Sequence, residues 1–251
     1  MLGSFFLLLI LVTIGSVAGI LGGIILLIKK NWAKSLASYS IPLAAGVLLA
    51  VSFLDLLPEA VSHIQEAAYS IMLLVFVVAF LIEKFLFTLH HHDVGHKRSY
   101  SAIPMVIFGD TIHNFLDGVA ITASFMVNPS LGVIVAFSTF LHETPHEIAD
   151  FGILLSAGWS RSKVFWANLL SALATFPGAL LTYFFLGVSE KTTGVLLALA
   201  SGLFLYVAAT DFLPELVEHR LKGSALKQSI LLLCGIALMV LIGILFPEVG
   251  G

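Results

Sequence analysis

The sequence predicts an all-α membrane protein that crosses the bilayer eight times, and its composition is the first reason. Of its 251 residues, 59% are hydrophobic and 11% are charged, whereas a soluble domain carries about 25% charged residues. So little charge cannot cover a water-facing surface, which excludes a soluble enzyme. The net charge of −3 gives no overall basic field for a nucleic acid, and the single Cys234 excludes an intramolecular disulfide.

Eight apolar segments are the second reason. A helix needs about 20 mostly apolar residues to cross a hydrocarbon layer. The first segment lacks a basic start and is too long for the apolar core of a signal peptide, so we expect it to be retained. The segments are 4–28, 40–58, 68–89, 102–124, 131–156, 163–187, 193–217 and 227–247.

The connections between these segments are short except at 90–101, so we expect a single transmembrane domain over residues 1–251. Its predicted parts are a three-helix unit at 1–89, a His-containing loop at 90–101, two polar helices at 102–156 and a second three-helix unit at 157–251.

The basic residues predict the orientation in the membrane. Lys191 is in an even-numbered loop, whereas nearly all the other basic residues lie in odd-numbered loops. Basic loops stay on the cytoplasmic side. We therefore expect a protein of the cell membrane with both termini outside. The basic residues of the odd-numbered loops are Lys29, Lys30, Lys34, Lys97, Arg98, Arg161, Lys163, Arg220, Lys222 and Lys227.

A repeat relates the second and seventh segments. The stretches GVLLAVSFLDLLPEAVSH (46–63) and GLFLYVAATDFLPELVEH (202–219) match at an offset of 156 residues. The two copies lie on segments that cross the membrane in opposite directions. Inverted repeats are typical of transporters, because two related halves can exchange inward-open and outward-open arrangements. The simpler interpretation is that a D-x-L-P-E motif only ends a helix with proline and interfacial acids.

The fourth and fifth segments carry polar side chains at membrane depth. An ionised carboxylate costs about 2.5–3.5 kcal/mol at the centre of a transmembrane helix, so these groups must face one another, water or a cation. Helical spacing puts the polar residues of each segment on one face. The nine side chains are Asp110, His113, Asn114, Asp117, His142, Glu143, His146, Glu147 and Asp150.

Imidazole, carboxylate and amide oxygen, without thiolate, suit exchangeable binding of divalent metals such as zinc, iron(II), manganese or cobalt. The alternative is an interhelical network that only holds the two helices together. Neither segment contains a lysine or arginine within its polar stretch, so these acids need a cation from elsewhere.

With HNFLDG in the fourth segment and HETPHEIADFGILL in the fifth, the chain resembles the ZIP family of divalent-metal importers, in the branch whose fifth span reads H-E-x-P-H-E-x-G-D. Ala149 replaces the glycine of that signature, and Phe176 stands where some prokaryotic members place a carboxylate for a second metal. The resemblance implies helices 1–3 and 6–8 as inverted repeats around helices 4 and 5. It further implies a binuclear site, transport of divalent metal toward the cytoplasm with Zn²⁺ as the expected substrate, no cofactor, and often a homodimer. The metal ligands that it implies are His113, Asn114, Asp117, His142, Glu143 and His146.

Other polar residues are candidates for accessory roles beside this site. Three of them, Asp110, Glu147 and Asp150, lie on the same helices as the site. Acids at the ends of the second and seventh segments could concentrate cations in vestibules, or could simply cap helix ends. The histidines of 90–96 could hold cytoplasmic metal or form a solvated loop. The vestibule acids are Asp55, Glu59, Asp211 and Glu215.

Two other functions fit parts of the pattern. Residues 142–146 satisfy H-E-x-x-H and 116–118 read LDG, as in intramembrane zinc proteases. In those enzymes, however, the LDG element follows H-E-x-x-H, and here Pro145 would disturb the helix that presents both histidines to one zinc. A metal-selective channel with the same site is the other alternative, since a sequence does not separate conduction from alternating access.

Overall fold

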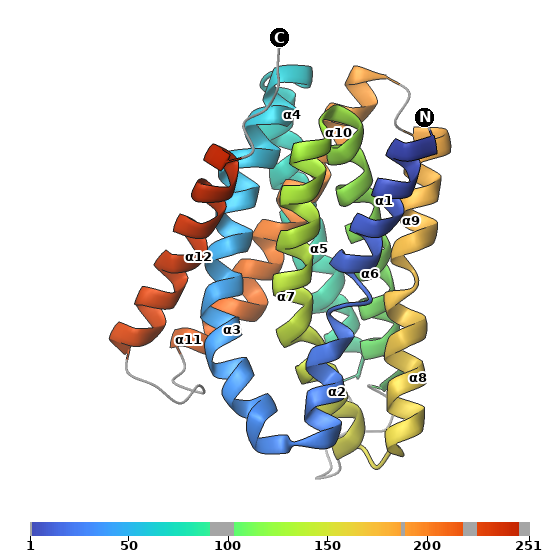
Figure 1. Ribbon diagram of the computed structural model, residues 1–251, viewed down its shortest axis with the longest axis vertical. Coiled ribbons are helices and arrows are strands. Elements are labelled where there is room, and N and C mark those ends of the chain that lie inside the picture. The colour runs from blue at the N-terminus through green and yellow to red at the C-terminus, as the bar shows by residue number, and fades with distance from the viewer. Residues whose placement is uncertain (1, 91–102, 187–188, 218–224, 246–251) are drawn as a thin grey trace.

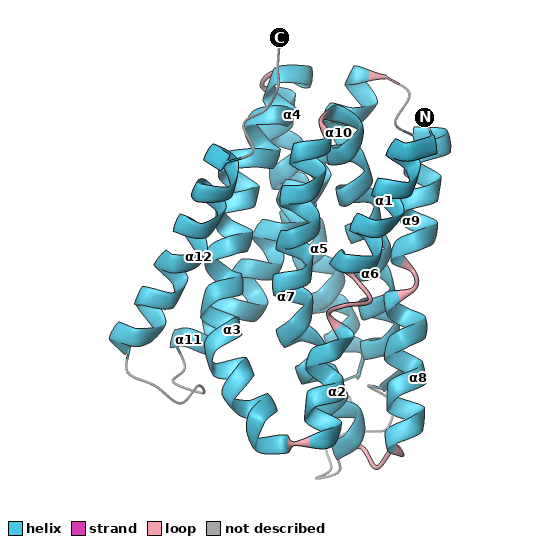
Figure 2. Ribbon diagram, viewed as in Figure 1, coloured by secondary structure: helices cyan, strands magenta, loops and turns pink. Residues whose placement is uncertain are grey.

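The computed structural model describes residues 2–90, 103–186, 189–217 and 225–245. Figure 1 shows that these residues form a bundle of long, roughly parallel rods. Figure 2 shows helices joined by short connections, with no strand in the described ranges. The prediction of an all-α polytopic membrane protein is confirmed.

Each predicted segment corresponds to one rod, although several rods contain more than one helix. The first half contains α1 (Leu2–Gly15), α2 (Ile20–Ile28), α3 (Lys30–Ala50), the π-helix η1 (Val51–Leu56), α4 (Leu57–Ile64), α5 (Ala67–His90) and α6 (Ile103–Val127). The second half contains α7 (Pro129–Ser156), α8 (Arg161–Ala172), α9 (Thr175–Leu181), η3 (Thr182–Leu186), α10 (Glu190–Val207), η4 (Ala208–Phe212), α11 (Leu213–Val217) and α12 (Ala225–Leu245).

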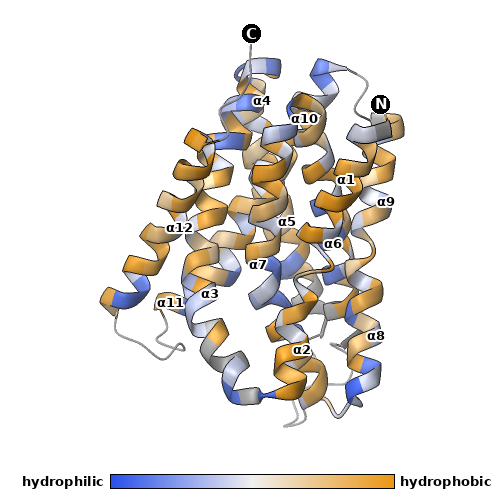
Figure 3. Ribbon diagram, in the orientation of Figure 1, coloured by the Kyte–Doolittle hydropathy of each residue, from blue (hydrophilic) through white to orange (hydrophobic). Residues whose placement is uncertain are grey.

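The outer surface of the bundle is apolar, as a membrane protein requires. Among the described residues, six helical stretches are long and apolar enough to cross a membrane. The two remaining rods, α6 and α7, have 25 and 28 residues, also enough to cross, but they carry the polar residues. Figure 3 shows hydrophilic residues halfway along these two helices, surrounded by apolar ones. The bundle therefore encloses its polar centre.

The sequence repeat has a structural counterpart in two π-helices. One covers Val51–Leu56 and the other Ala208–Phe212, so the repeat offset of 156 superimposes them almost residue for residue. Each ends two residues before a proline of the repeat, Pro58 or Pro214. Proline has no N–H for the carbonyl four residues earlier, and a π-helical turn accommodates the interrupted hydrogen-bond ladder. The same local sequence thus deforms both rods in the same way.

The repeated rods also pack in a reciprocal manner. The α3 helix crosses α12, and α10 crosses α5. A side chain on Gly46 would overlap the backbone carbonyl of Leu232, and one on the matching Gly202 would overlap that of Met72. Each unit therefore places its second rod against the third rod of the other unit.

The first and sixth rods are broken, although the sequence predicted continuous helices. The first is interrupted at 16–19 and the sixth at 173–174, close to the same repeat offset. Beyond each break a glycine allows close contact with a central helix, Gly22 with Thr144 of α7 and Gly178 with Phe115 of α6. The two units therefore enclose α6 and α7 from opposite sides, which places the polar helices at the centre.

We expect Gly46→Ala and Gly202→Ala each to destabilise the bundle, because the added methyl group would push apart backbones already in contact, at a cost of about 1–3 kcal/mol. The melting temperature of the purified protein in detergent tests this. A matched control is Gly243→Ala on α12, where nothing lies within 4 Å of an added Cβ. Equal melting temperatures for all three variants would contradict the packing described.

Candidate metal site

Four ligand groups converge where α6 faces α7. His113 and Asp117 come from α6, and His142 and Glu143 from α7. One ligand atom from each lies within 4.8 Å of all the others. The Nε2 of His113 is 3.1 Å from Glu143 Oε1 and 3.3 Å from His142 Nε2, and His142 Nε2 is 3.3 Å from Asp117 Oδ2. Ligands about 2.0–2.1 Å from a tetrahedral zinc lie about 3.3 Å apart, which is close to these three distances. The distance from His142 Nε2 to Glu143 Oε1 is 3.6 Å and that from His113 Nε2 to Asp117 Oδ2 is 3.8 Å, so the four atoms would have to move slightly closer together around an ion.

These four residues, called here the central cluster, are withdrawn from water. Asp117 and His142 are fully buried and Glu143 is 1% exposed. The carboxylates of Asp117 and Glu143 have no partner among the described residues other than the imidazoles of the cluster. Burying ionised carboxylates in this way is costly unless a positive charge compensates them. Apart from the two imidazoles, the compensation that fits this geometry is a cation between the four groups.

The orientation of His142 is fixed by its own helix. Its Nδ1 lies 3.0 Å from the carbonyl oxygen of Ser138. A carbonyl only accepts, so Nδ1 carries the proton and Nε2 presents its lone pair to the central cluster. A hydrogen bond of this kind sets the tautomer and raises the basicity of a metal-binding histidine.

Asn114 is buried beside the cluster but makes other contacts. Its amide nitrogen donates to Asp110, 2.9 Å from Oδ1, and its amide oxygen accepts from the hydroxyl of Thr175 at 3.3 Å. Thr175 begins α9, so Asn114 lies between the cluster and the sixth rod. The contact with Thr175 was not predicted, and a lone threonine in an apolar segment gives no signal that would have revealed it.

His146 lies one turn beyond His142 and faces the seventh rod. Its ring stacks on that of His113, with the centroids 5.3 Å apart, but its Nε2 is 3.5 Å from Asp211 Oδ2 in η4. The side chains of His146 and Asp211 are 22% and 39% exposed. The structure therefore places His146 between the buried cluster and a more accessible carboxylate.

The remaining acids of α6 and α7 continue toward the same end of the bundle. Asp110 lies one turn before His113, and Glu147 and Asp150 lie one to two turns beyond Glu143. Glu147 is 1% exposed and neither of its oxygens has a hydrogen-bond partner, whereas Asp110 and Asp150 are half-buried. Because α6 and α7 run in opposite directions (Figure 1), these three residues lie on one side of the cluster.

The opposite side of the cluster is closed. Phe204 of α10 is fully buried with its ring 5.3 Å from that of His142. One turn further from the site, the hydroxyl of Ser201 donates to the carbonyl oxygen of Ser52 in η1 at 3.0 Å, and both serines are fully buried. This contact joins the second and seventh rods directly. No feature of the sequence predicted it.

The vestibule acids are not part of the cluster. Glu59 pairs with His63 at 3.2 Å in α4, at the end of the bundle where Figure 1 places the N-terminus. Asp55 and Glu215 are half-buried on their π-helical and α11 segments. His90 ends α5, and the rest of the histidine loop, 91–96, lies outside the described residues.

Two matching helical units enclose a buried cluster of potential metal ligands, as inverted repeats do around the binding sites of many transporters. The sequence profile of the family described as ZIP zinc transporter matches residues 93–243, more than half of the chain. The chain therefore belongs to the ZIP zinc transporter family.

Individual relatives agree with this assignment. Zinc transporter ZIP13 of Pongo abelii is 34% identical over 215 residues, which cover 79% of this chain and 64% of that protein. Zinc transporter foi of Drosophila melanogaster is 39% identical over 141 residues, 56% of this chain and 20% of that protein. Zinc transporter ZIP4 of Homo sapiens is 44% identical over 116 residues, 46% of this chain and 18% of that protein.

Family membership places the chain among transporters rather than enzymes. The geometry agrees, because a protease of the H-E-x-x-H type would aim both histidines at one zinc. Here His142 faces the central cluster, whereas His146 Nε2 faces Asp211.

We expect His142→Ala to weaken binding of Zn²⁺ by at least tenfold, because loss of about 1.4 kcal/mol of coordination energy already has that effect. Titration calorimetry on the purified protein measures it. His63→Ala, in the Glu59 pair at the far end of the bundle, is the matched control and should bind as the wild type does. Equal weakening by both substitutions would place the binding elsewhere.

Proposed function

We propose that this protein moves divalent transition-metal ions, zinc first among them, across a cell membrane into the cytoplasm through the central cluster. The observation that carries the proposal is the convergence of four ligand groups, two of them buried carboxylates, between the two repeated helical units. The names of the relatives, each called a zinc transporter, support zinc as the substrate.

In the proposed cycle, the lone pairs of the central cluster replace the water shell of the arriving ion. Asn114 and His146 flank the cluster and complete the six-ligand set. Glu143 can be shared between the two metal positions of a binuclear site, because its second oxygen, Oε2, has no other partner. Mixed nitrogen and oxygen ligands hold the ion less firmly than thiolates would, so the ion can leave again. Release then passes from His146 to Asp211 and along Asp110, Glu147 and Asp150.

The positions of the cations support the proposed orientation in the membrane. The α2–α3 junction and the starts of α8 and α12 lie in the lower half of Figure 1, away from the N-terminus. These places carry Lys29, Lys163 and Lys227. Basic residues remain cytoplasmic, so we infer that the accessible side of the cluster faces the cytoplasm and both termini face outward.

Alternating access explains why one side is closed while the other is accessible. In the proposed orientation, the hydrogen bond from Ser201 to the Ser52 carbonyl lies on the outer side of the cluster, and it joins rods from different repeat units. Rigid-body movement of one unit against the other would break this contact and open the outer side. A channel would need no such movement.

Metal uptake into sealed proteoliposomes tests the function. We expect wild type to take up Zn²⁺ with saturation, and the double variant His142→Ala, His146→Ala to lose most of the uptake, because a cluster residue and its neighbour on the release side are both removed. His63→Ala serves as the control. Uptake that is equal in wild type and the double variant would show the site assignment to be wrong.

A reversible cross-link separates alternating access from a channel. Ser52→Cys and Ser201→Cys are introduced together in a Cys234→Ser background, which removes the chain's single native cysteine. Bridging the pair with a short bis-methanethiosulfonate reagent should stop uptake, and dithiothreitol should restore it. Each single-cysteine variant, treated alike, should remain active. Undiminished uptake through a fully cross-linked protein would favour a channel.

A further inference from the structure

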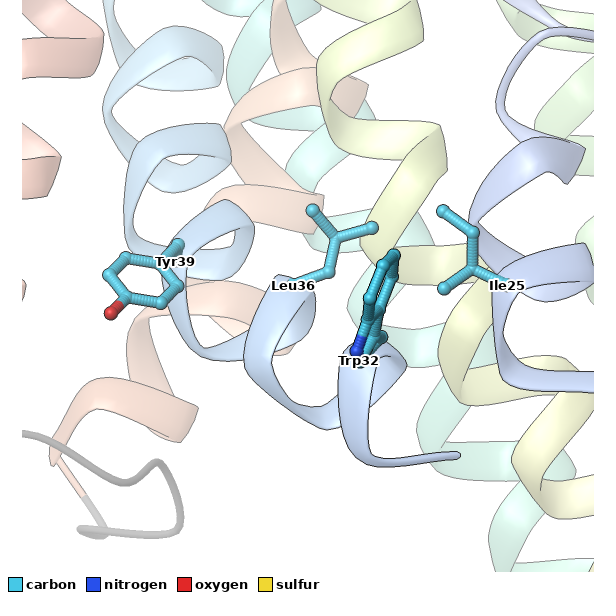
Figure 4. Close-up of a pocket in the computed structure, with 4 residues that line it drawn as sticks. All are labelled: Ile25, Trp32, Leu36 and Tyr39. Carbon is cyan, nitrogen blue, oxygen red and sulfur yellow. The ribbon is translucent and has the colours of Figure 1, made fainter. Parts of the chain in front are cut away.

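Ligand groups gather at the central cluster and not in the pocket of about 420 Å³ that α2 and α3 line. The pocket offers an ion neither carboxylate nor imidazole, because its lining residues are Ile25, Trp32, Leu36 and Tyr39 (Figure 4). The choice between divalent ions therefore depends on which further side chains can reach an ion at the cluster. Asn114, fully buried on α6 beside the cluster, is such a side chain.

The Asn114 amide is held by contacts outside the central cluster. Its nitrogen donates to Oδ1 and to the backbone carbonyl oxygen of Asp110, at 2.9 and 3.1 Å. Its oxygen, the atom that could bind a metal, accepts from the hydroxyl of Thr175 at 3.3 Å. Exchanging the two ends of the amide would bring its oxygen against two acceptors of Asp110. The nitrogen therefore stays with Asp110, and the oxygen stays with Thr175.

The break in the sixth rod brings Thr175 to Asn114. The α9 helix begins at Thr175, directly after the break at 173–174, and the Thr175 hydroxyl also lies 2.8 Å from the carbonyl oxygen of Ala172. On α6, Gly118 leaves room for the backbone of Thr175, because a side chain there would overlap the Thr175 carbonyl oxygen. Thr175 is fully buried. Its position is therefore set by the packing of two backbones.

We propose that Thr175 is a positioning residue that sets the ion preference of the central cluster by holding the Asn114 oxygen away from the ion, an inference that rests on the proposed function. With Asn114 held, an ion meets two imidazoles and two carboxylates, a set that suits tetrahedral zinc. Manganese favours octahedral, oxygen-rich coordination, so it gains more than zinc from an added amide oxygen. Asn114 joins the ion only by giving up its hydrogen bond to Thr175.

Equilibrium competition between Zn²⁺ and Mn²⁺ for the purified protein tests this without any need for transport. The quantity measured is the dissociation constant for Mn²⁺ divided by that for Zn²⁺. Thr175→Val keeps the shape of the side chain but removes the hydroxyl, and should lower this ratio about threefold to tenfold, as expected for one neutral hydrogen bond. Thr175→Ala also lacks the hydroxyl and should lower the ratio too. Thr175→Ser retains it and should restore the wild-type ratio.

Two further variants make the result specific to the Asn114 contact. Asn114→Ala removes the amide, so adding Thr175→Val to it should change the ratio no further. Thr182→Val removes another fully buried hydroxyl of the same rod, one that donates to the carbonyl oxygen of Gly178 at 2.9 Å. This matched control should keep the wild-type ratio.

The possible outcomes separate this inference from the proposed function. An unchanged ratio in both Thr175→Val and Thr175→Ala would overturn the inference. An equal shift in Thr182→Val, or a shift that persists in the Asn114→Ala background, would overturn it as well. A wild-type protein that binds no Zn²⁺ would instead contradict the proposed function, because the central cluster would then not be a metal site.

Discussion

Asp117 and Glu143 are buried halfway across a membrane-spanning bundle with only the imidazoles of the cluster beside their carboxylates, and the rest of the site depends on this condition. An ionised carboxylate at such a depth is tolerated only opposite a positive charge or a bound cation. His113 and His142 supply the remaining two lone pairs, and the hydrogen bond to Ser138 keeps the His142 lone pair pointing inward. Such a site binds a divalent ion most strongly when the ion has lost its water shell, because the four groups can then contact the ion directly.

The central helices are themselves related by a regular spacing. His113, Asn114 and Asp117 of α6 lie 29 residues before His142, Glu143 and His146 of α7. Of these equivalent positions, His113 and His142 face each other across the cluster, whereas the other pairs differ in chemistry and in neighbours. Asn114 packs toward Thr175, and His146 packs toward Asp211, which removes each of them from the innermost group. The two helices therefore match in residue spacing but differ in how their ligands are placed. Four groups lie at the centre of the site and two at its margins.

Much of this arrangement could be predicted because it depends on periodicity. The polar faces of α6 and α7 follow from helical spacing, and the match between Gly46 and Gly202 follows from the repeat. The breaks at 16–19 and 173–174 could not be predicted, since they occur in uniformly apolar sequence and result from packing against the central helices. The direction of the Asn114 amide could not be predicted either, because it depends on Thr175, 61 residues away along the chain.

The two ends of the cluster differ in a way that has an energetic consequence. On the Phe204 side, the repeat units are joined by the hydrogen bond from Ser201 to the Ser52 carbonyl, worth about 0.5–1.5 kcal/mol net, and by the packing of α10 against η1, α4 and α5. On the other side, His146 Nε2 and Asp211 Oδ2 are 3.5 Å apart, and both side chains are partly solvated. A partly solvated ion pair contributes little to stability, whereas buried packing contributes more, so the Phe204 side is held together more firmly than the Asp211 side. In the alternating-access mechanism proposed above, the state that is open on the Phe204 side would have to offset the loss of this packing by other contacts or by a stronger preference for the ion.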